Sequence, residues 1–175
     1  MKKMNVRFLA NSALLAALYV ALTWILAPIS FGPIQFRISE ILILLVVYNP
    51  MYSIPLTIAC LIANTLSGLG WYDLVFGTLA TALAFIPMCF IKKPYIAAIF
   101  PVLSNAFIIA LELYLALELP FWYSALTVGA GELIVLYALG VPAMLIITRN
   151  DRLVELLSLR VVKKKNQNIE DTDNI

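Results

Sequence analysis

Charged and amide side chains interrupt long apolar stretches of this sequence, and they are the residues whose types could do chemistry. With neighbouring aromatic rings they form one set of candidate ligand-binding residues: Gln35, Arg37, Glu40, Asn64, Trp71, Tyr72, Asp73, Asn105, Glu112 and Glu132. Carboxylates, amides and rings around a cavity can hold a small polar or cationic solute. Arg37 and Glu40 are spaced i, i+3, so on a helix they share a face and can neutralise each other.

Other chemistries find little support in the sequence. Histidine is absent, which removes the most common general base and metal ligand. No GxxxxGK[ST] phosphate loop is present, so ATP-driven work would need a second polypeptide. Cys60 and Cys89 lie in apolar runs without a partner motif. We therefore expect no metal, no cofactor, no nucleic-acid partner and no enzymatic activity.

Composition indicates where these residues must be positioned. The chain has 175 residues, of which 63% are hydrophobic and 13% charged, more apolar side chains than a soluble domain of this size can bury. It is predicted to be an all-α integral membrane protein. The apolar run after the basic N-terminus, residues 8–27, is too long for a typical cleaved signal peptide and is expected to be a retained span.

Helix-breaking residues divide the apolar sequence into six predicted transmembrane helices: 8–27, 33–49, 51–68, 72–91, 95–118 and 121–148. Eleven of the twelve Lys and Arg residues lie within residues 1–7, at Lys92 and Lys93, or after Thr148. Because basic residues are retained in the cytoplasm, six spans across the cell membrane place these clusters and both termini on its cytoplasmic side. Arg37 is then the one cation expected on the outer side.

The chain is expected to have two parts. Residues 1–148 would form a membrane-embedded substrate-binding domain, and residues 149–175 a cytoplasmic segment. Within that segment, residues 151–162 have the pattern of an amphipathic helix, for which a place on the membrane surface is favoured over partner docking. Residues 166–175 are polar and predicted to be disordered.

The candidate ligand residues are expected in the outer half of the membrane. Pro33 would begin the second helix, which places residues 35–40 in its first two turns. Glu132 would lie ~16 Å below the outer end of the sixth helix. The alternatives are a capping role for Asp73 and interhelical hydrogen bonds for Asn64 and Asn105. Glu118, beside a predicted loop, is expected to be a solvated end charge.

Two helices carry stripes of small residues that would let another helix approach closely. The first helix has Ala13, Ala17 and Ala21, and the fourth has Gly77, Thr81 and Ala84. Taken alone, such a stripe more often packs inside its own bundle than against a partner.

Several sequence strings resemble the QueT family, which comprises substrate-binding S components of energy-coupling factor (ECF) transporters. They are ALYVALT at 17–23, APISFGPIQFRISE at 27–40, CLIAN at 60–64, DLVFGTLAT at 73–81, PVLSN at 101–105 and VGAGELIVLYALG at 128–140. The string FGPIQFRISE together with GEL in the sixth helix is the most specific part. The resemblance covers roughly residues 8–145.

The resemblance implies a six-helix S component that captures a queuosine precursor, a 7-deazaguanine base, from outside. Docking through Ala13, Ala17 and Ala21 onto a transmembrane T component with two ATPase subunits is likewise implied. Glu40 or Glu132 would accept from the N–H edge of the base, and Trp71, Tyr72 and Phe36 could stack on its ring. The other predicted contacts to the base are Gln35, Arg37, Asn64 and Asn105.

Three competing functions remain open. One is an S component for another nutrient, such as a vitamin. A second is a self-sufficient proton-coupled carrier that uses Glu112 or Glu132. The third, a membrane enzyme acting on a lipid substrate, is disfavoured because the acids lack the close pairing that a metal site requires.

Overall fold

The computed structural model describes residues 6–31 and 35–160, and in that part of the chain every regular element is a helix. Four helical stretches are long and apolar enough to cross a membrane: Val6–Ile25, Trp71–Met88, Pro94–Leu117 and Phe121–Arg149. Two further apolar stretches, Ile38–Val47 and Pro50–Asn64, are shorter. The predicted all-helical membrane fold is confirmed, with four of the six predicted spans at full length among the described residues.

The elements in chain order are α1 (Val6–Ile25), α2 (Ala27–Ser30), η1 (Ile38–Val47), η2 (Pro50–Tyr52), α3 (Ser53–Asn64), α4 (Trp71–Met88), α5 (Pro94–Ala97), α6 (Ile99–Leu117), α7 (Phe121–Ile134), η3 (Val135–Gly140), α8 (Val141–Arg149) and α9 (Asp151–Leu156). Proline lies in the first turn of α2, η2, α5 and α8, where its missing N–H removes no helical hydrogen bond. The π-helical η3 joins α7 to α8 without a break, so these three elements form one long helix.

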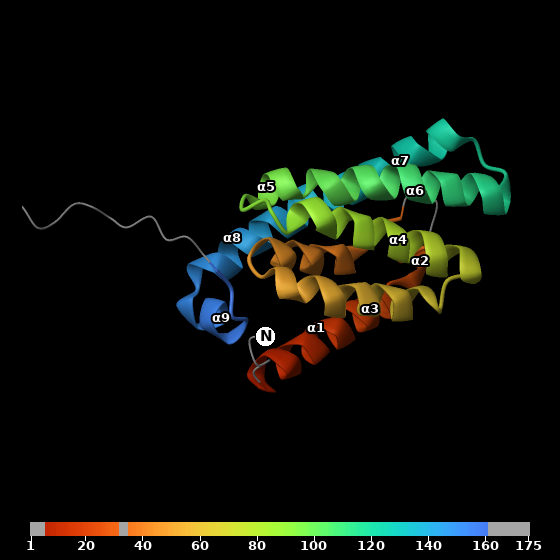
Figure 1. Cartoon of the computed structure of the whole chain (residues 1–175). Helices are drawn as coiled ribbons and strands as arrows, with labels where there is room; N and C mark the ends of the chain where they lie inside the picture. The colour runs from red at the N-terminus through yellow and green to blue at the C-terminus, as the bar shows by residue number, and fades with distance from the viewer. Residues whose placement is uncertain (1–5, 32–34, 161–175) are drawn as a thin grey trace, which may run out of the picture.

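The short helix η1 runs through the middle of the bundle (Figure 1). Seven of its ten residues are buried, as expected for a helix that is apolar on nearly all sides. α1 packs against η1 and α3, while α4 and α7 pack against α6. Because η1 is enclosed in this way, the side chains near its first turn are held inside the bundle.

The second helix begins later than predicted. It was expected from residue 33, but η1 starts at Ile38, with Arg37 at the N-cap position. Gln35 has a φ of +48°, a left-handed conformation that cannot belong to a right-handed helix. Gln35 and Arg37 therefore lie in an irregular segment before the helix, and Pro33 lies outside the described residues.

The two ends of the bundle differ in charge. One end, which we call the basic end, carries Arg7, Lys92, Lys93, Arg149, Arg152 and Arg160. It lies on the left of Figure 1, with the start of α1, α5 and α9. The other end, which we call the opposite end, contains the α6–α7 connection, the start of α4 and the segment before η1.

The C-terminal segment packs against the basic end. The amphipathic helix predicted over residues 151–162 is shorter in the structure, where α9 ends at Leu156. Hydrogen bonds tie the segment to the bundle: the Asn11 amide donates to Leu156 O, the Tyr52 hydroxyl to Leu157 O (2.8 Å), the Asn49 amide to Ser158 O (3.2 Å) and the Arg160 N–H to Tyr48 O (3.0 Å). The tail predicted to be disordered lies outside the described residues.

Candidate ligand-binding site

The structure buries all of the charged and amide residues that the sequence analysis selected as ligand contacts. These residues, which we call the polar cluster, have exposed fractions of at most 8%: Gln35, Arg37, Glu40, Asn64, Asp73, Asn105, Glu112 and Glu132. Trp71 differs, because 61% of it is exposed. Its ring stacks on Tyr72 with a centroid distance of 3.9 Å, so this aromatic pair lies nearer the surface than the polar cluster.

Arg37 and Glu40 are in contact, as their spacing predicts. Nη1 of Arg37 lies 3.9 Å from Oε1 of Glu40, and the Tyr19 hydroxyl donates to the same oxygen at 2.6 Å. The guanidinium also faces the ring of Phe31, with Cζ 5.1 Å from the ring centroid, which is a cation–π contact. α1, η1 and the segment before η1 therefore meet at this ion pair.

Three further helices each contribute a buried acidic residue to the polar cluster. Asp73 lies in the first turn of α4 and Glu112 on α6, and their carboxyl groups are within electrostatic range of each other. Glu132 on α7 interacts with the side-chain amide of Asn105 on α6. Each of these three carboxyl groups also feels the positive charge of Arg37. The single guanidinium thus serves several acids that are far apart in sequence.

Asn64 connects α3 to α4 beside these acids. Its Nδ2 donates to the backbone oxygen of Asp73 at 2.9 Å, so the interhelical hydrogen bond considered as the alternative for Asn64 is present. Gly77 makes room for this amide, because a Cβ there would lie 2.7 Å from Nδ2. One turn earlier on α3, the Cys60 sulfur lies 3.3 Å from the Thr81 hydroxyl.

Residues of α1 also contribute to the polar cluster, and the sequence analysis did not select them. Besides Tyr19, the Thr23 hydroxyl lies 2.7 Å from the Ser39 hydroxyl at the start of η1. Ser12, Tyr19 and Thr23 are all on the buried face of α1. Their spacing of seven and four residues places them on one helix face, and this spacing of hydroxyl groups is the signal for them in the sequence.

Many polar atoms of the cluster have no hydrogen-bond partner within residues 6–31 and 35–160. They are Nε and Nη2 of Arg37, Oε2 of Glu40, Oδ1 of Asn64, Oδ1 of Asp73, both carboxyl oxygens of Glu112 and Oε1 of Glu132. Leaving a buried polar atom unpaired costs about 1–3 kcal/mol, so the cluster carries a large unmet capacity for donors and acceptors. It is suited to a solute with several polar atoms. Among the described residues, no group of three or more His, Cys, Asp or Glu could hold a metal ion.

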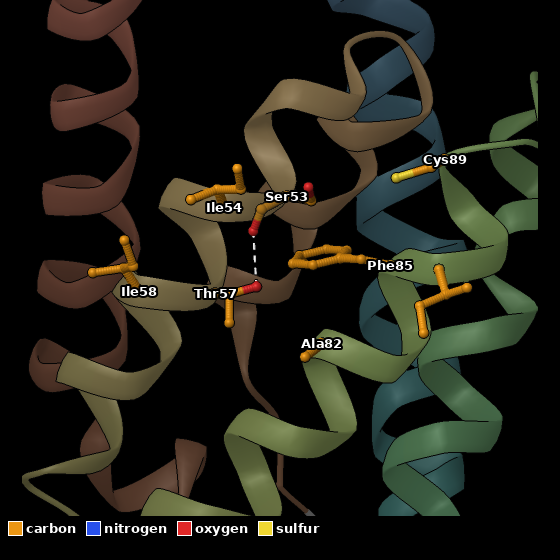
Figure 2. Close-up of a pocket in the computed structure, with 8 residues that line it drawn as sticks. Ser53, Ile54, Thr57, Ile58, Ala82, Phe85 and Cys89 are labelled. Carbon is orange, nitrogen blue, oxygen red and sulfur yellow. Dashed lines mark hydrogen bonds between the residues drawn. The ribbon is translucent and has the colours of Figure 1, made fainter.

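A groove between α3 and α4 has a different character (Figure 2). It has a volume of about 360 Å³ and is lined mainly by apolar side chains, including Ile54, Ile58 and Phe85. Its two hydroxyls bond to their own chain: Thr57 donates to Ser53 O at 2.8 Å, and Ser53 donates to a carbonyl in the preceding turn. Without free polar groups, this groove is a poor site for a polar solute.

The two stripes of small residues have different environments. Ala13, Ala17 and Ala21 are exposed on α1, while the other face of α1 packs into the bundle. Gly77, Thr81 and Ala84 are buried on α4. Packing within the bundle therefore accounts for the stripe on α4 but not for that on α1.

Apolar helices around a buried polar cluster define a multi-pass membrane protein. The family is shown by sequence comparison: residues 9–149 match the family model described as QueT transporter. The chain belongs to the QueT transporter family, and it is therefore a transport protein and not an enzyme.

One relative is the queuosine precursor transporter QueT of Lactococcus lactis subsp. cremoris. The two chains are 38% identical over 150 residues, which cover 75% of this chain and 87% of the relative. No solved structure matches the chain. The resemblance to the QueT family that the sequence strings indicate is confirmed.

Proposed function

We propose that this chain is the S component of an ECF transporter and captures a queuosine precursor of the 7-deazaguanine type from outside the cell. A transmembrane T component and two ATPase subunits would energise delivery inward. Family membership and the relative's name support the transported solute. The structural observation that carries the proposal is the set of buried guanidinium, amide and carboxylate atoms that have no hydrogen-bond partner in the described part of the chain.

The chemistry of a 7-deazaguanine base matches these atoms. Its guanine-like edge has adjacent N–H donors beside a carbonyl oxygen, and carboxylates and guanidinium groups form strong bonds with such groups. We assign the N–H edge to Glu40 or Glu132, because each has a carboxyl oxygen without a partner. The carbonyl oxygen and the ring nitrogens of the base would be bound by Arg37, Gln35, Asn64 and Asn105. Asp73 and Glu112 would supply further negative charge around the base.

Aromatic rings would cover the flat faces of the bound base. Trp71 and Tyr72 begin α4 at the opposite end, so we place this stacked pair at the entrance. Phe36 is next to Arg37 and partly buried, which suits a ring that stacks deeper in the site.

We propose six membrane spans with both termini in the cytoplasm. In this topology the second span is η1, and the third span is η2 together with α3. Both are short for a membrane span, and irregular chain at the opposite end covers the remaining thickness of the bilayer. The test uses single cysteines at Lys93 and Glu118 in a chain whose native cysteines are replaced by serine. An impermeant maleimide should label Glu118→Cys in intact cells and Lys93→Cys only after lysis; the reverse pattern would contradict this orientation.

Calorimetric titration with a 7-deazaguanine precursor tests the binding site. Glu132→Gln should weaken binding by about 100-fold, because a charge-assisted hydrogen bond is lost in a buried site. Glu118→Gln is the matched control, since Glu118 is exposed at the end of α6, and should bind like the parent chain. Equal affinities for all three proteins would remove Glu132 from the site.

Docking on the T component is proposed through Ala13, Ala17 and Ala21, whose exposure on α1 supports this role. Ala17→Leu should abolish ATP-dependent uptake by the complete transporter and leave ligand binding to the isolated chain unchanged. Ala138→Leu changes an exposed alanine on η3 in the same way and should leave uptake intact. If Ala17→Leu reduced binding and uptake together, the stripe would have a structural role within this chain.

The burial of Glu112 and Glu132 inside the bundle keeps one alternative open, a proton-coupled carrier that works alone through either of these acids. Reconstitution of this chain by itself in proteoliposomes separates the two functions. An S component should bind the precursor but accumulate none when a proton gradient is imposed, whereas gradient-driven uptake without ATP would establish the carrier.

A further inference from the structure

A cavity at the basic end is separate from the polar cluster. It has a volume of about 650 Å³, and its wall includes Tyr48, Phe90, Lys92, Lys93, Thr148 and Arg160. These residues come from the end of η1, the stretch after α4 and the chain from α8 onward. Because α4 and α8 end here, the cavity lies where the hydrocarbon layer of a bilayer gives way to lipid headgroups and water.

The fold holds three cations around this cavity. The backbone N–H of Arg160 donates to Tyr48 O at 3.0 Å, and the neighbouring Leu159 is buried against the bundle. Nζ of Lys93 lies 6.0 Å from the ring centroid of Tyr95. Within residues 6–31 and 35–160, the ion pairs found do not involve Lys92, Lys93 or Arg160. Within the described part of the chain, the charges of these three residues are therefore not taken up by an ion pair.

Apart from the hydroxyl-bearing Tyr48 and Thr148, the rest of the cavity wall is apolar. Val47, Pro50 and Cys89 contribute to it, together with Phe90, which is 82% exposed. An exposed aromatic ring beside two lysines suits the membrane interface, where one part of a site contacts acyl chains and another contacts phosphate. A free phosphate ion would use the cations but leave this apolar wall without a partner.

We propose that this cavity binds the headgroup of an anionic phospholipid. Lys92, Lys93 and Arg160 contact the phosphate, and Phe90 with the adjoining apolar wall contacts the glycerol and the first acyl carbons. The C-terminal segment that is hydrogen-bonded to the basic end contributes to this site, because it places Arg160 on the same cavity wall as the two lysines.

Native mass spectrometry of the full chain, purified in a mild detergent, tests the proposal with phosphatidylglycerol and phosphatidylcholine as probes. Lys92→Gln/Lys93→Gln should lower the affinity for phosphatidylglycerol by about 25-fold, at about fivefold for each cation lost beside an anionic headgroup. Arg149→Gln/Arg152→Gln removes the same charge from the same end but not from the cavity wall, and should retain the affinity. Phosphatidylcholine should bind all three proteins weakly and equally.

Two outcomes would overturn this assignment. If both double variants lost phosphatidylglycerol equally, the attraction would be a diffuse property of the basic end and not of the cavity. Thermal unfolding in detergent with added inorganic phosphate provides the second. If inorganic phosphate raised the unfolding midpoint as much as phosphatidylglycerol does, and this rise were lost in Lys92→Gln/Lys93→Gln, the cavity would be a site for the free ion. An unfolding midpoint equal to that of the parent chain without added lipid would confirm that the variants are folded.

Discussion

The two ends of the bundle differ in whether their buried polar side chains have hydrogen-bond partners. At the basic end, the side chains of Asn49 and Tyr52 donate to backbone oxygens of the C-terminal segment. Toward the opposite end, atoms of Arg37, Glu112 and Glu132 are equally buried but have no hydrogen-bond partner among the described residues. Hydrogen bonds that close within the chain stabilise it, whereas unpaired buried groups lower its stability and gain partners when a polar solute binds. The contrast supports a structural role for the first end and the proposed ligand-binding role for the second.

The largest effect is expected at Arg37, the shared counter-charge of the cluster. Arg37→Gln should lower the free energy of unfolding by about 3–5 kcal/mol, because it leaves buried carboxyl groups without their cation. The double variant Arg37→Gln/Glu40→Gln removes both partners of the ion pair and should regain much of that stability. Thermal unfolding in detergent measures the stability of each protein.

Ligand binding separates the two roles of Arg37. The double variant should remain unable to bind a 7-deazaguanine precursor even where its stability recovers, because the donor and an acceptor for the base are both missing. Binding at parental affinity by a stable double variant would show that the ion pair is structural and that recognition lies elsewhere.

A smaller effect is expected at the contact between α3 and α4. Gly77→Ala places a Cβ 2.7 Å from Nδ2 of Asn64, which should displace the amide and lower stability by about 1–3 kcal/mol. Gly68→Ala is the matched control, since its Cβ would meet no atom within 4 Å. Thermal unfolding and precursor titration should show both properties reduced in Gly77→Ala alone. Unchanged binding in a destabilised Gly77→Ala would exclude Asn64 from the ligand site.

The smallest effect is expected at the basic end. Tyr52→Phe removes the hydroxyl that donates to Leu157 O, and should lower stability by about 1 kcal/mol, or about 2–4 °C in the unfolding midpoint of a chain this size. Affinity for the precursor should not change, because the hydroxyl lies at the far end of the bundle. A marked loss of affinity would mean that the two ends are coupled.

Much of the fold follows from local sequence. The long apolar runs around Leu15, Leu79, Ile109 and Leu136 predict helices that the structure contains, with ends that differ by only a few residues from the predicted ones. The selection of the charged and amide residues also needed no structure, because a charged group inside an apolar run must find polar surroundings. Their burial in one polar cluster agrees with that physical requirement.

Other features depend on contacts between distant segments. The predicted start of the second helix was wrong. The backbone around Gln35 and Arg37 is set by the packing of Arg37 against Phe31 and Glu40 and not by local helix propensity. Tyr19 was missed because its role appears only when α1 lies against η1. A hydroxyl in an apolar run causes little local conflict, so the sequence alone carries a weak signal for it.

By itself, the sequence determined that this is a helical membrane protein with acids and one arginine in its interior, because hydropathy and charge placement are properties of the chain. The tertiary structure decided which carboxyl group pairs with Arg37, which small-residue stripe faces outward, and how residues 151–160 pack against the basic end. These outcomes depend on the rotation and depth of each helix relative to its neighbours. Packing sets both quantities, and they bring together residues that are far apart along the chain.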